Sequence, residues 1–319
     1  MTLRKTILAG VLAAAAATPL AAQEPVKIGM ITTLSGPAGY LGQDIRDGFQ
    51  LAIDAEDGKL GGVPVELMVE DDSLKPGNGR QIADRYLNNE GVKLFTGIVF
   101  SNVAGATVPD IVDAGAFYIS PNAAPSNFAG KECNENYFVV SWQNDSLQFH
   151  PGGLGIAFLR QYQQAGLLET VPMVVAEPSM DAGILNAVGD AAKGVNVSSH
   201  WNTDFENSAN EAFVAAWKEA YGRPLTYYAS QGYDAARAIA AALKATGGSV
   251  DDADAFRNAM REAAFESVRG DFAFGPNQHP VQDWFSLKVV DGEDGKPALK
   301  TVGTVFEDHG DVYAAECSL

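Results

Sequence analysis

Histidine and cysteine are both scarce in this chain of 319 residues, which contains four histidines and two cysteines. The histidines are far from one another and from the cysteines, so the ligand spacing of a metal site is missing; they are His150, His200, His279 and His309. A Gly-Lys-Ser/Thr phosphate loop and the Gly-x-Ser-x-Gly turn of a hydrolase are also missing. We therefore expect no metal, no cofactor and no enzymatic activity.

Positive charge is in short supply as well, with 22 lysines and arginines against 40 aspartates and glutamates and a formal net charge of −18. A field of that sign repels phosphate backbones and anionic lipid headgroups, so we expect no nucleic acid partner. No apolar run approaches the roughly twenty residues that cross a bilayer. The length suggests about two domains with a core each.

The first residues follow the order of a secretory signal peptide. Arg4 and Lys5 precede an apolar run at residues 7–17, and small residues follow as far as Ala22. Removal of residues 1–22 leaves 297 residues with a net charge of −20. No cysteine follows the apolar run to carry a lipid anchor. We therefore expect a freely diffusing periplasmic protein.

Both cysteines, Cys133 and Cys317, would enter this oxidising compartment. A minimal, even count favours one structural disulfide there, with two free buried thiols as the alternative. Such a bridge would tie the C-terminus back to the middle of the chain.

Strand and helix patterns alternate along the first half of the chain. Residues 26–31 form a β-rich apolar run, and residues 43–57 carry Ile45, Phe49 and Ile53 at four-residue spacing, which indicates an amphipathic helix. The alternation continues with strands at 63–69, 93–99 and 116–120 and helices at 78–89 and 103–113. Repeated βα units predict an α/β fold, in which helices cover both faces of a parallel sheet.

The second half continues these patterns without a low-complexity linker. It predicts strands at 137–142 and 173–176, a Gly-rich loop at 151–155, helices at 156–166, 210–221, 227–244 and 252–264, and a hairpin of residues 284–290 with 299–305. Two lobes joined by short strands can hinge but not drift apart.

Polar residues follow three strands of the first half. Ligands of parallel sheets bind outside the carboxyl ends of the strands, so these segments should line one edge; they contribute Ser35 and Tyr40, Ser101 and Asn102, and Asn122 to Ala124. Two of the segments lead into helices, whose N-termini favour negative charge, so a ligand carboxylate would fit there. The alternative is that the serines merely cap the helices.

At this point the chain resembles a known family, the leucine/isoleucine/valine-binding proteins, which are type I periplasmic binding proteins of ABC importers. The resemblance covers nearly the whole chain after residue 22. It rests on the order of several segments: residues 27–29, 34–37, 41–49, 119–121, 152–155, 228–236 and 267–274. The tail segment 267–283 looks like the subgroup associated with aromatic and other organic acids.

The resemblance implies roles for individual residues. Ser101 takes the position of the hydroxyl that binds the ligand carboxylate, and Asn122, Ala123 and Ala124 supply donors from the next loop. Ala124 stands where the amino-acid binders have a second hydroxyl, so it can offer only its backbone N–H.

Glu177 falls near the family's carboxylate for a ligand ammonium. If Glu177 reaches the cleft, an amino acid is the expected ligand, whereas an exposed, solvated Glu177 favours an acid without an amine. Gln231, in the resembling segment 228–236, completes the candidate ligand-binding set.

One departure from the family lies between residues 142 and 151. Two βα units of the second lobe are missing there, on the order of 60 residues at about 30 per unit. The expected fold is therefore the two-lobe type I periplasmic-binding-protein fold, with parallel sheets flanked by helices and a shortened second lobe. We expect a signal peptide at 1–22, a first lobe at 23–136 and 227–275, and a second lobe at 137–226 and 276–319.

The function implied is a periplasmic substrate-binding protein of an ABC-type importer. Its ligand would be a branched-chain or hydrophobic amino acid or a related aromatic carboxylate, and its partner an inner-membrane permease, with the protein itself a monomer. One alternative is a ligand-sensing module for a receptor, which would use the same residues. The others are an α/β hydrolase-type enzyme and a shortened copy that no longer binds.

Overall fold

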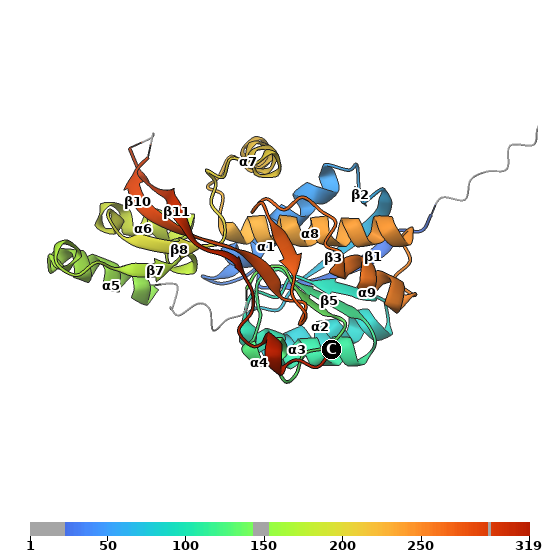
Figure 1. Ribbon diagram of the computed structural model, residues 1–319. Helices are drawn as coiled ribbons and strands as arrows, with labels where there is room; N and C mark the ends of the chain where they lie inside the picture. The colour runs from blue at the N-terminus through green and yellow to red at the C-terminus, as the bar shows by residue number, and fades with distance from the viewer. Residues whose placement is uncertain (1–22, 143–152, 293–294) are drawn as a thin grey trace, which may run out of the picture.

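The computed structural model describes residues 23–142, 153–292 and 295–319, and Figure 1 shows two lobes with a sheet in each. The signal-peptide prediction falls outside this range. The sheet of the first lobe has the order β2-β3-β1-β4-β5-β6, in which only β2 runs antiparallel to its neighbour. Its strands are β1 (Val26–Thr32), β2 (Lys59–Leu60), β3 (Val63–Asp71), β4 (Leu94–Thr96), β5 (Phe117–Ser120) and β6 (Tyr137–Val139).

Helices cover both faces of this sheet because its buried strands alternate apolar side chains between the two faces. In β5, Phe117 and Ile119 belong to one core cluster and Tyr118 to the other. The first cluster is shared with α1 (Gly39–Asp54), α8 (Tyr227–Thr246) and α9 (Ala253–Arg261), and the second with α2 (Pro76–Asn88), α3 (Ser101–Asp113) and α4 (Ser126–Ala129). The predicted α/β class and two-lobe arrangement are confirmed.

Helices α1 and α8 pack closely because each has a glycine at the contact. A Cβ atom on Gly48 would lie 2.0 Å from the carbonyl oxygen of Ala229, and one on Gly232 would lie 2.1 Å from that of Ile45. The apolar face of α1 predicted from its spacing is buried, with Ile45 and Phe49 both at 0% exposure.

The second lobe contains few elements. Its sheet has the order β11-β10-β8-β7, and β9 pairs with β10. Its strands are β7 (Val174–Ala176), β8 (Asn196–Ser199), β10 (Pro280–Asp291) and β11 (Pro297–His309), and its helices are α5 (Gly153–Gln164) and α6 (Ala182–Val188). The short strand β9 (Phe272–Phe274) pairs with the start of β10, and its phenylalanines pack against the core of the first lobe. Only β7 and β8 are parallel to each other, so among the described residues this lobe holds a single βαβ unit. Three short elements here, η2 (Leu167–Glu169), η3 (Glu177–Ser179) and η4 (Gly189–Ala192), are single 3₁₀ turns.

The two faces of this second sheet differ in character. Val175, Val197 and Leu287 are partners in register and point into one cluster with Leu159 of α5 and Ile184 of α6. The neighbouring positions point the other way and are mostly polar; they are Val174, Asn196, Ser198, Ser286 and Lys288. Because α5 and α6 cover one face of the sheet, the shortened lobe has a hydrophobic core of its own.

Several segments link the lobes. The chain leaves the first lobe after Trp142 and returns through His200, and β10 begins beside β9 in the first lobe and ends beside β8 in the second. Helix α7 (Ser208–Tyr221) follows His200, and its Phe213 and Trp217 belong to the core cluster that includes α1 and α8. The predicted boundary, in contrast, puts residues 137–226 in the second lobe. The assignment of lobe boundaries stays a prediction.

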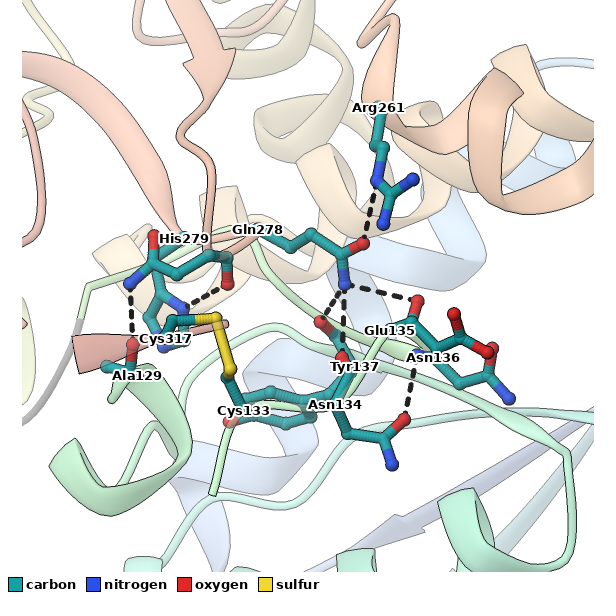
Figure 2. The surroundings of a disulfide bond; sticks show 11 residues. Ala129, Cys133, Asn134, Glu135, Asn136, Tyr137, Arg261, Gln278, His279 and Cys317 are labelled. Carbon is teal, nitrogen blue, oxygen red and sulfur yellow. Dashed lines mark hydrogen bonds between the residues drawn. A yellow bond between two sulfur atoms is a disulfide. The ribbon is translucent and has the colours of Figure 1, made fainter. Parts of the chain in front are cut away.

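The predicted disulfide is present and joins Cys133 to Cys317 with a Cα–Cα distance of 5.7 Å (Figure 2). It fastens the tail after β11 to the loop before β6. Beside it, the Gln278 amide donates to three backbone carbonyls around the start of β6, including Tyr137 O at 2.7 Å. The tail and the start of β10 are therefore both anchored to the first lobe.

Most predicted elements are confirmed to within a few residues, and a few were missed. Sequence reasoning did not identify β2, β8, β9 or α6. The β8 sequence Asn-Val-Ser-Ser has one strongly apolar residue, because only one of its faces is covered. Part of the predicted Gly-rich loop, residues 151–152, lies outside the described residues, and α5 begins at Gly153.

Candidate functional site

The loops after β1, β4 and β5 meet at one edge of the first sheet, as predicted, because these strands are neighbours in that order. The amide nitrogen Nδ2 of Asn122 donates to Val99 O at 2.6 Å, and the Ala123 N–H donates to Ile98 O at 3.2 Å. These bonds hold the β5 loop against the segment that enters α3 at Ser101. The Asn122 side-chain amide and the Ala123 N–H, which the resemblance predicts as donors to the ligand, therefore donate to the protein backbone instead. Oδ1 of Asn122 has no partner among the described residues.

The capping alternative for the two serines is not supported. Helix α1 begins after Ala38 and α3 after Phe100, and neither helix has a side-chain cap hydrogen bond. Ser101 is the first residue of α3 and half-buried. Ser35 is exposed, with its hydroxyl 3.4 Å from that of Ser73. The two serines thus differ in exposure, and the sequence pattern did not predict this difference.

The remaining first-lobe candidates differ in exposure. Asn102 is exposed, and Ala124 is fully buried. Gln231 in α8 is also fully buried, and neither atom of its amide has a partner among the described residues. An unpaired buried amide costs free energy, so each such group calls for a ligand or a water molecule.

Glu177 lies at the carboxyl end of β7 and is 5% exposed, so it is not a solvated surface glutamate. Burial raises the pKa of Glu177 well above its usual range, and the nearby Asp181 raises it further, against an opposing contact with Ser199. The hydrogen bonds agree with a protonated Glu177. The Ser199 hydroxyl has one proton and two oxygen neighbours, Glu177 Oε2 and Trp201 O, so both contacts are satisfied if Glu177 donates.

Asp181 joins the two lobes, and sequence reasoning missed it. Its Oδ1 accepts from the backbone N–H groups of Gly183 and Ile184 at the start of α6, and its Oδ2 accepts from the Tyr40 hydroxyl of the first lobe at 2.9 Å. Desolvation raises the pKa of Asp181 to about 6, although the backbone N–H groups and Tyr40 oppose the shift. An aspartate placed just before an apolar Ala-Gly-Ile-Leu stretch is a helix-capping signal that could have pointed to it.

Glu177 also lines a cavity of about 280 Å³ between the lobes. Its walls come from α6, the segment after β8, the segment before α8 and the start of β11. The lining residues are Glu177, Ala182, Leu185, Asn186, residues 201–203, residues 224–226 and residues 296–299. Glu177 is the only sequence-predicted site residue in this lining, and Trp201 and Thr226 were not anticipated. The volume suits a small organic molecule.

Several buried polar atoms without a partner belong to residues at or just after the ends of strands. Thr32 at the end of β1, Ser179 after β7 and His200 after β8 each have a buried side-chain atom without a partner among the described residues, as do Asn122 and Gln231. Desolvation, reinforced by the nearby Arg269 charge, lowers the pKa of His200 well below its usual range, so its ring is neutral. Both sheets thus have unpaired polar groups at or just after the carboxyl ends of strands, where parallel α/β folds bind ligands.

We expect the melting temperature to depend on pH through Asp181. Its pKa is about 6 in the folded protein and 3.8 for an unperturbed aspartate, so the folded state binds the extra proton between these values. Stability due to Asp181 is therefore present at low pH and is lost as the pH rises through 6. Differential scanning calorimetry should show a smaller gain on going from pH 7.5 to 5.0 in Asp181→Asn than in the parent, since asparagine still caps α6.

The matched control for this experiment is Asp190→Asn at an exposed aspartate. Its pH dependence should equal that of the parent. A parent-like pH dependence in Asp181→Asn would show that the buried carboxyl does not titrate as described.

Comparisons with known proteins agree with this architecture. The sequence profile of the family described as periplasmic binding protein matches residues 25–148 and 146–296. A Leu/Ile/Val-binding protein homolog 6 from Brucella abortus is 24% identical over 366 residues, covering 90% of this chain and 93% of the relative. The Leu/Ile/Val-binding protein BraC3 of Rhizobium johnstonii is 33% identical over 122 residues, covering 37% of this chain and 32% of that protein.

Solved structures show the same fold. An ABC transporter substrate-binding protein from Sphaerobacter thermophilus aligns with a TM-score of 0.84 and 24% identity, covering 89% of this chain and 99% of that one. A solute binding protein of an ABC transporter from R. palustris, in complex with benzoate, aligns with a TM-score of 0.82 and 24% identity, covering 93% and 100%. The fold is that of a two-lobe binding protein. This chain belongs to the periplasmic binding protein family.

The alignment with the Brucella relative also locates a difference in length. About 90% of this chain aligns over 366 positions, so roughly 80 of those positions have no counterpart in the 319 residues here. The two matched stretches of the family profile meet at residues 146–148, in the region where sequence reasoning placed the shortening.

Among the described residues, no helix is long and apolar enough to span a membrane, and no three His, Cys, Asp or Glu side chains group as metal ligands.

Proposed function

We propose that this protein captures a small hydrophobic amino acid between its lobes and presents it to an ABC-type importer. The observation that carries the proposal is the interlobe cavity with Glu177 buried in its wall. A buried carboxyl group without a counter-charge is costly, and a ligand ammonium would supply that charge. The Leu/Ile/Val-binding names of the relatives support the same ligand class.

A second ligand class, an aromatic carboxylate, is favoured by the protonated state of Glu177. A neutral carboxyl group can donate a hydrogen bond and needs no ammonium beside it, and Trp201 in the wall offers an apolar ring. The benzoate bound by the R. palustris neighbour shows that this fold accommodates such a ligand.

A thermal-shift panel with Glu177→Gln separates the two classes. The parent is tested against leucine, isoleucine, valine, benzoate and 4-hydroxybenzoate, because ligand at a hundredfold excess over the dissociation constant adds about 2.7 kcal/mol of stability. If an amino acid binds, Glu177→Gln should weaken it at least tenfold; if a benzoate binds, the variant should bind nearly as well as the parent. A parent that responds to no member of the panel contradicts the proposal.

We further propose, on the family resemblance, that Ser101 anchors the ligand carboxylate; Ser101 does not line the cavity beside Glu177, so this contact requires the lobes to close on the ligand. A hydrogen bond to a charged group contributes about 1.5–3 kcal/mol, so Ser101→Ala should weaken binding by on the order of tenfold to a hundredfold. Ser35→Ala, at an exposed hydroxyl on the same edge, is the matched control and should bind within a few-fold of the parent. Isothermal titration calorimetry with the ligand found above measures both. Equal losses in the two variants would assign Ser101 no special role.

We also propose that the protein is exported to the periplasm and loses residues 1–22. The charged, apolar and small-residue segments at the N-terminus support this, and so does membership in the periplasmic binding protein family. Intact mass spectrometry of the periplasmic fraction should find a chain that begins at Gln23. A mature chain that still contains Arg4 and Lys5 would exclude this processing.

The sequence led us to expect a monomer that docks on a permease. Delivery to a permease remains part of the proposed function, because the relatives of known fold are components of ABC transporters.

A further inference from the structure

Exposed apolar side chains gather at the outer end of the second lobe. Phe158 of α5 is 46% exposed, Val171 is 52% exposed and Val174 of β7 is 69% exposed. Leu167 between them is 38% exposed, and the Tyr162 ring packs 5.7 Å from that of Phe158. We call these five residues the edge patch. Figure 1 shows α5 and β7 at the end of the molecule that is remote from the first lobe.

Strand β7 also ends its sheet, so one of its edges lacks a neighbouring strand among the described residues. The Asn196 N–H donates to Met173 O. The backbone groups of successive residues in a strand point alternately to its two sides, so those of Val175 point toward β8 and those of Val174 and Ala176 point outward. Two residues therefore present backbone donors and acceptors along an apolar, unpaired edge. Such an edge is a template for pairing with another strand.

The charge around this edge is unusual for the chain. Residues 153–176 contain one arginine and one glutamate, Arg160 and Glu169, and are neutral overall, whereas the whole chain carries −18. Two copies of so acidic a protein repel each other over most of their surfaces. The neutral segment is a place where they can approach without that repulsion.

This chain is also shorter than the Brucella relative. Roughly 80 aligned positions have no counterpart here, and the break in the family profile at residues 146–148 comes directly before α5. Along the sequence, the edge patch thus follows the region where the family match divides.

We propose that β7 pairs antiparallel with β7 of a second copy of this chain, which covers the edge patch in a two-fold symmetric dimer. With Val175 opposite its own counterpart, Val174 faces Ala176 of the copy, and both residues turn their backbone groups toward the partner strand. A two-fold axis normal to the sheet keeps α5 of each copy on the same face of the joined sheet. Phe158 and Tyr162 would then pack across the axis.

The other open edge of this sheet is less suited to pairing. Strand β11 also carries exposed apolar residues, among them Val302 and Val305 at 57% and 51% exposure. Its register against β10 is irregular at three places, including the positions around these two valines. Bulges of this kind twist an edge away from an incoming strand. Val305 therefore provides a matched control.

Light scattering coupled to size-exclusion chromatography tests the proposal on the mature chain at 1–100 μM. The parent should elute with twice the mass of one chain at the higher concentrations. Val174→Glu should weaken the dimer at least tenfold, and Val305→Glu should leave it unchanged. Circular dichroism and melting curves should show that both variants fold, because both side chains are exposed in one copy.

A second experiment tests the strand register with oppositely charged variants. In the proposed register the two Val174 side chains are diagonal neighbours, within reach of long side chains. Val174→Glu and Val174→Lys should each be monomeric alone, and an equimolar mixture should restore a dimer. A monomeric parent at 100 μM, a polydisperse aggregate, or a dimer sensitive to Val305→Glu but not to Val174→Glu would overturn the proposal.

Discussion

Replacing Arg269 by methionine is expected to lower the free energy of unfolding by about 3–5 kcal/mol, because it leaves a buried charge without its partner. The Arg269 guanidinium is 2% exposed and donates from Nε to the fully buried Asp234 at 3.0 Å. It also donates to Gln282 Oε1 at 2.6 Å and to Val140 O. Chemical denaturation of the mature protein measures the loss.

Two further variants make this result interpretable. Arg80→Met breaks an ion pair with Asp110 whose side chains are 60% and 49% exposed, and it should cost less than about 1 kcal/mol. The double variant Asp234→Leu with Arg269→Met removes both charges and should be more stable than Arg269→Met alone. If Arg269→Met costs no more than Arg80→Met, the buried pair does not organise the structure as described.

The position of Arg269 gives this network a part in lobe motion. Val140 lies just before the chain leaves the first lobe, and Gln282 lies in β10, which runs into the second lobe. Arg269 holds both segments against Asp234 of α8 in the first lobe. Any hinge movement between the lobes must therefore take place beyond these anchors, near Trp142, His200 and Trp284. The centroid of the His200 ring lies 4.9 Å from that of Trp142 and 5.7 Å from that of Trp284.

Removing the disulfide is expected to have an effect of similar size. Replacing both Cys133 and Cys317 by serine opens a loop closed over 184 residues, and such bridges typically contribute about 2–5 kcal/mol. The stability loss should appear as a lower denaturation midpoint. Limited proteolysis should also cut the tail after β11 much faster, because the bridge is what fastens residues 310–319 beside Tyr137 and Gln278.

Reduction of the parent by a phosphine reductant supplies the matched comparison, since it opens the same loop without a substitution. Parent and double variant should then unfold at the same denaturant concentration. A midpoint unchanged from that of the oxidised parent would mean that the tail is held by its other contacts alone.

The first lobe could be predicted closely because its signals are local. The four-residue spacing of Ile45, Phe49 and Ile53 indicates α1 without reference to any other segment, and the buried strands appear as short apolar runs. Neighbouring parallel strands bring their carboxyl ends to one edge, so the contact of Asn122 with Val99, in the segment that enters α3, also follows from the pattern. The pairing of Cys133 with Cys317 needed only the count of cysteines and the prediction of an oxidising compartment.

The second lobe and the junction could not be predicted in the same way. Strand β8 has one covered face, so its polar residues hid it from a search for apolar runs. Asp181 and Tyr40 are 141 residues apart, and nothing in either local segment indicates that they meet. Trp201 and Thr226 enter the cavity wall only because the lobes are folded against each other.

The sequence by itself thus determined the α/β class, the two lobes, the disulfide and the edge of the first sheet, because periodicity, strand order and residue counts act over short stretches of chain. Tertiary structure alone decided which carboxyl groups are buried at the junction and which hydroxyls lie exposed. A pKa and an unpaired hydrogen-bonding group depend on every neighbour within a few ångströms, and those neighbours come from segments far apart in the sequence. For Glu177 and Asp181, burial is the largest cause of the raised pKa.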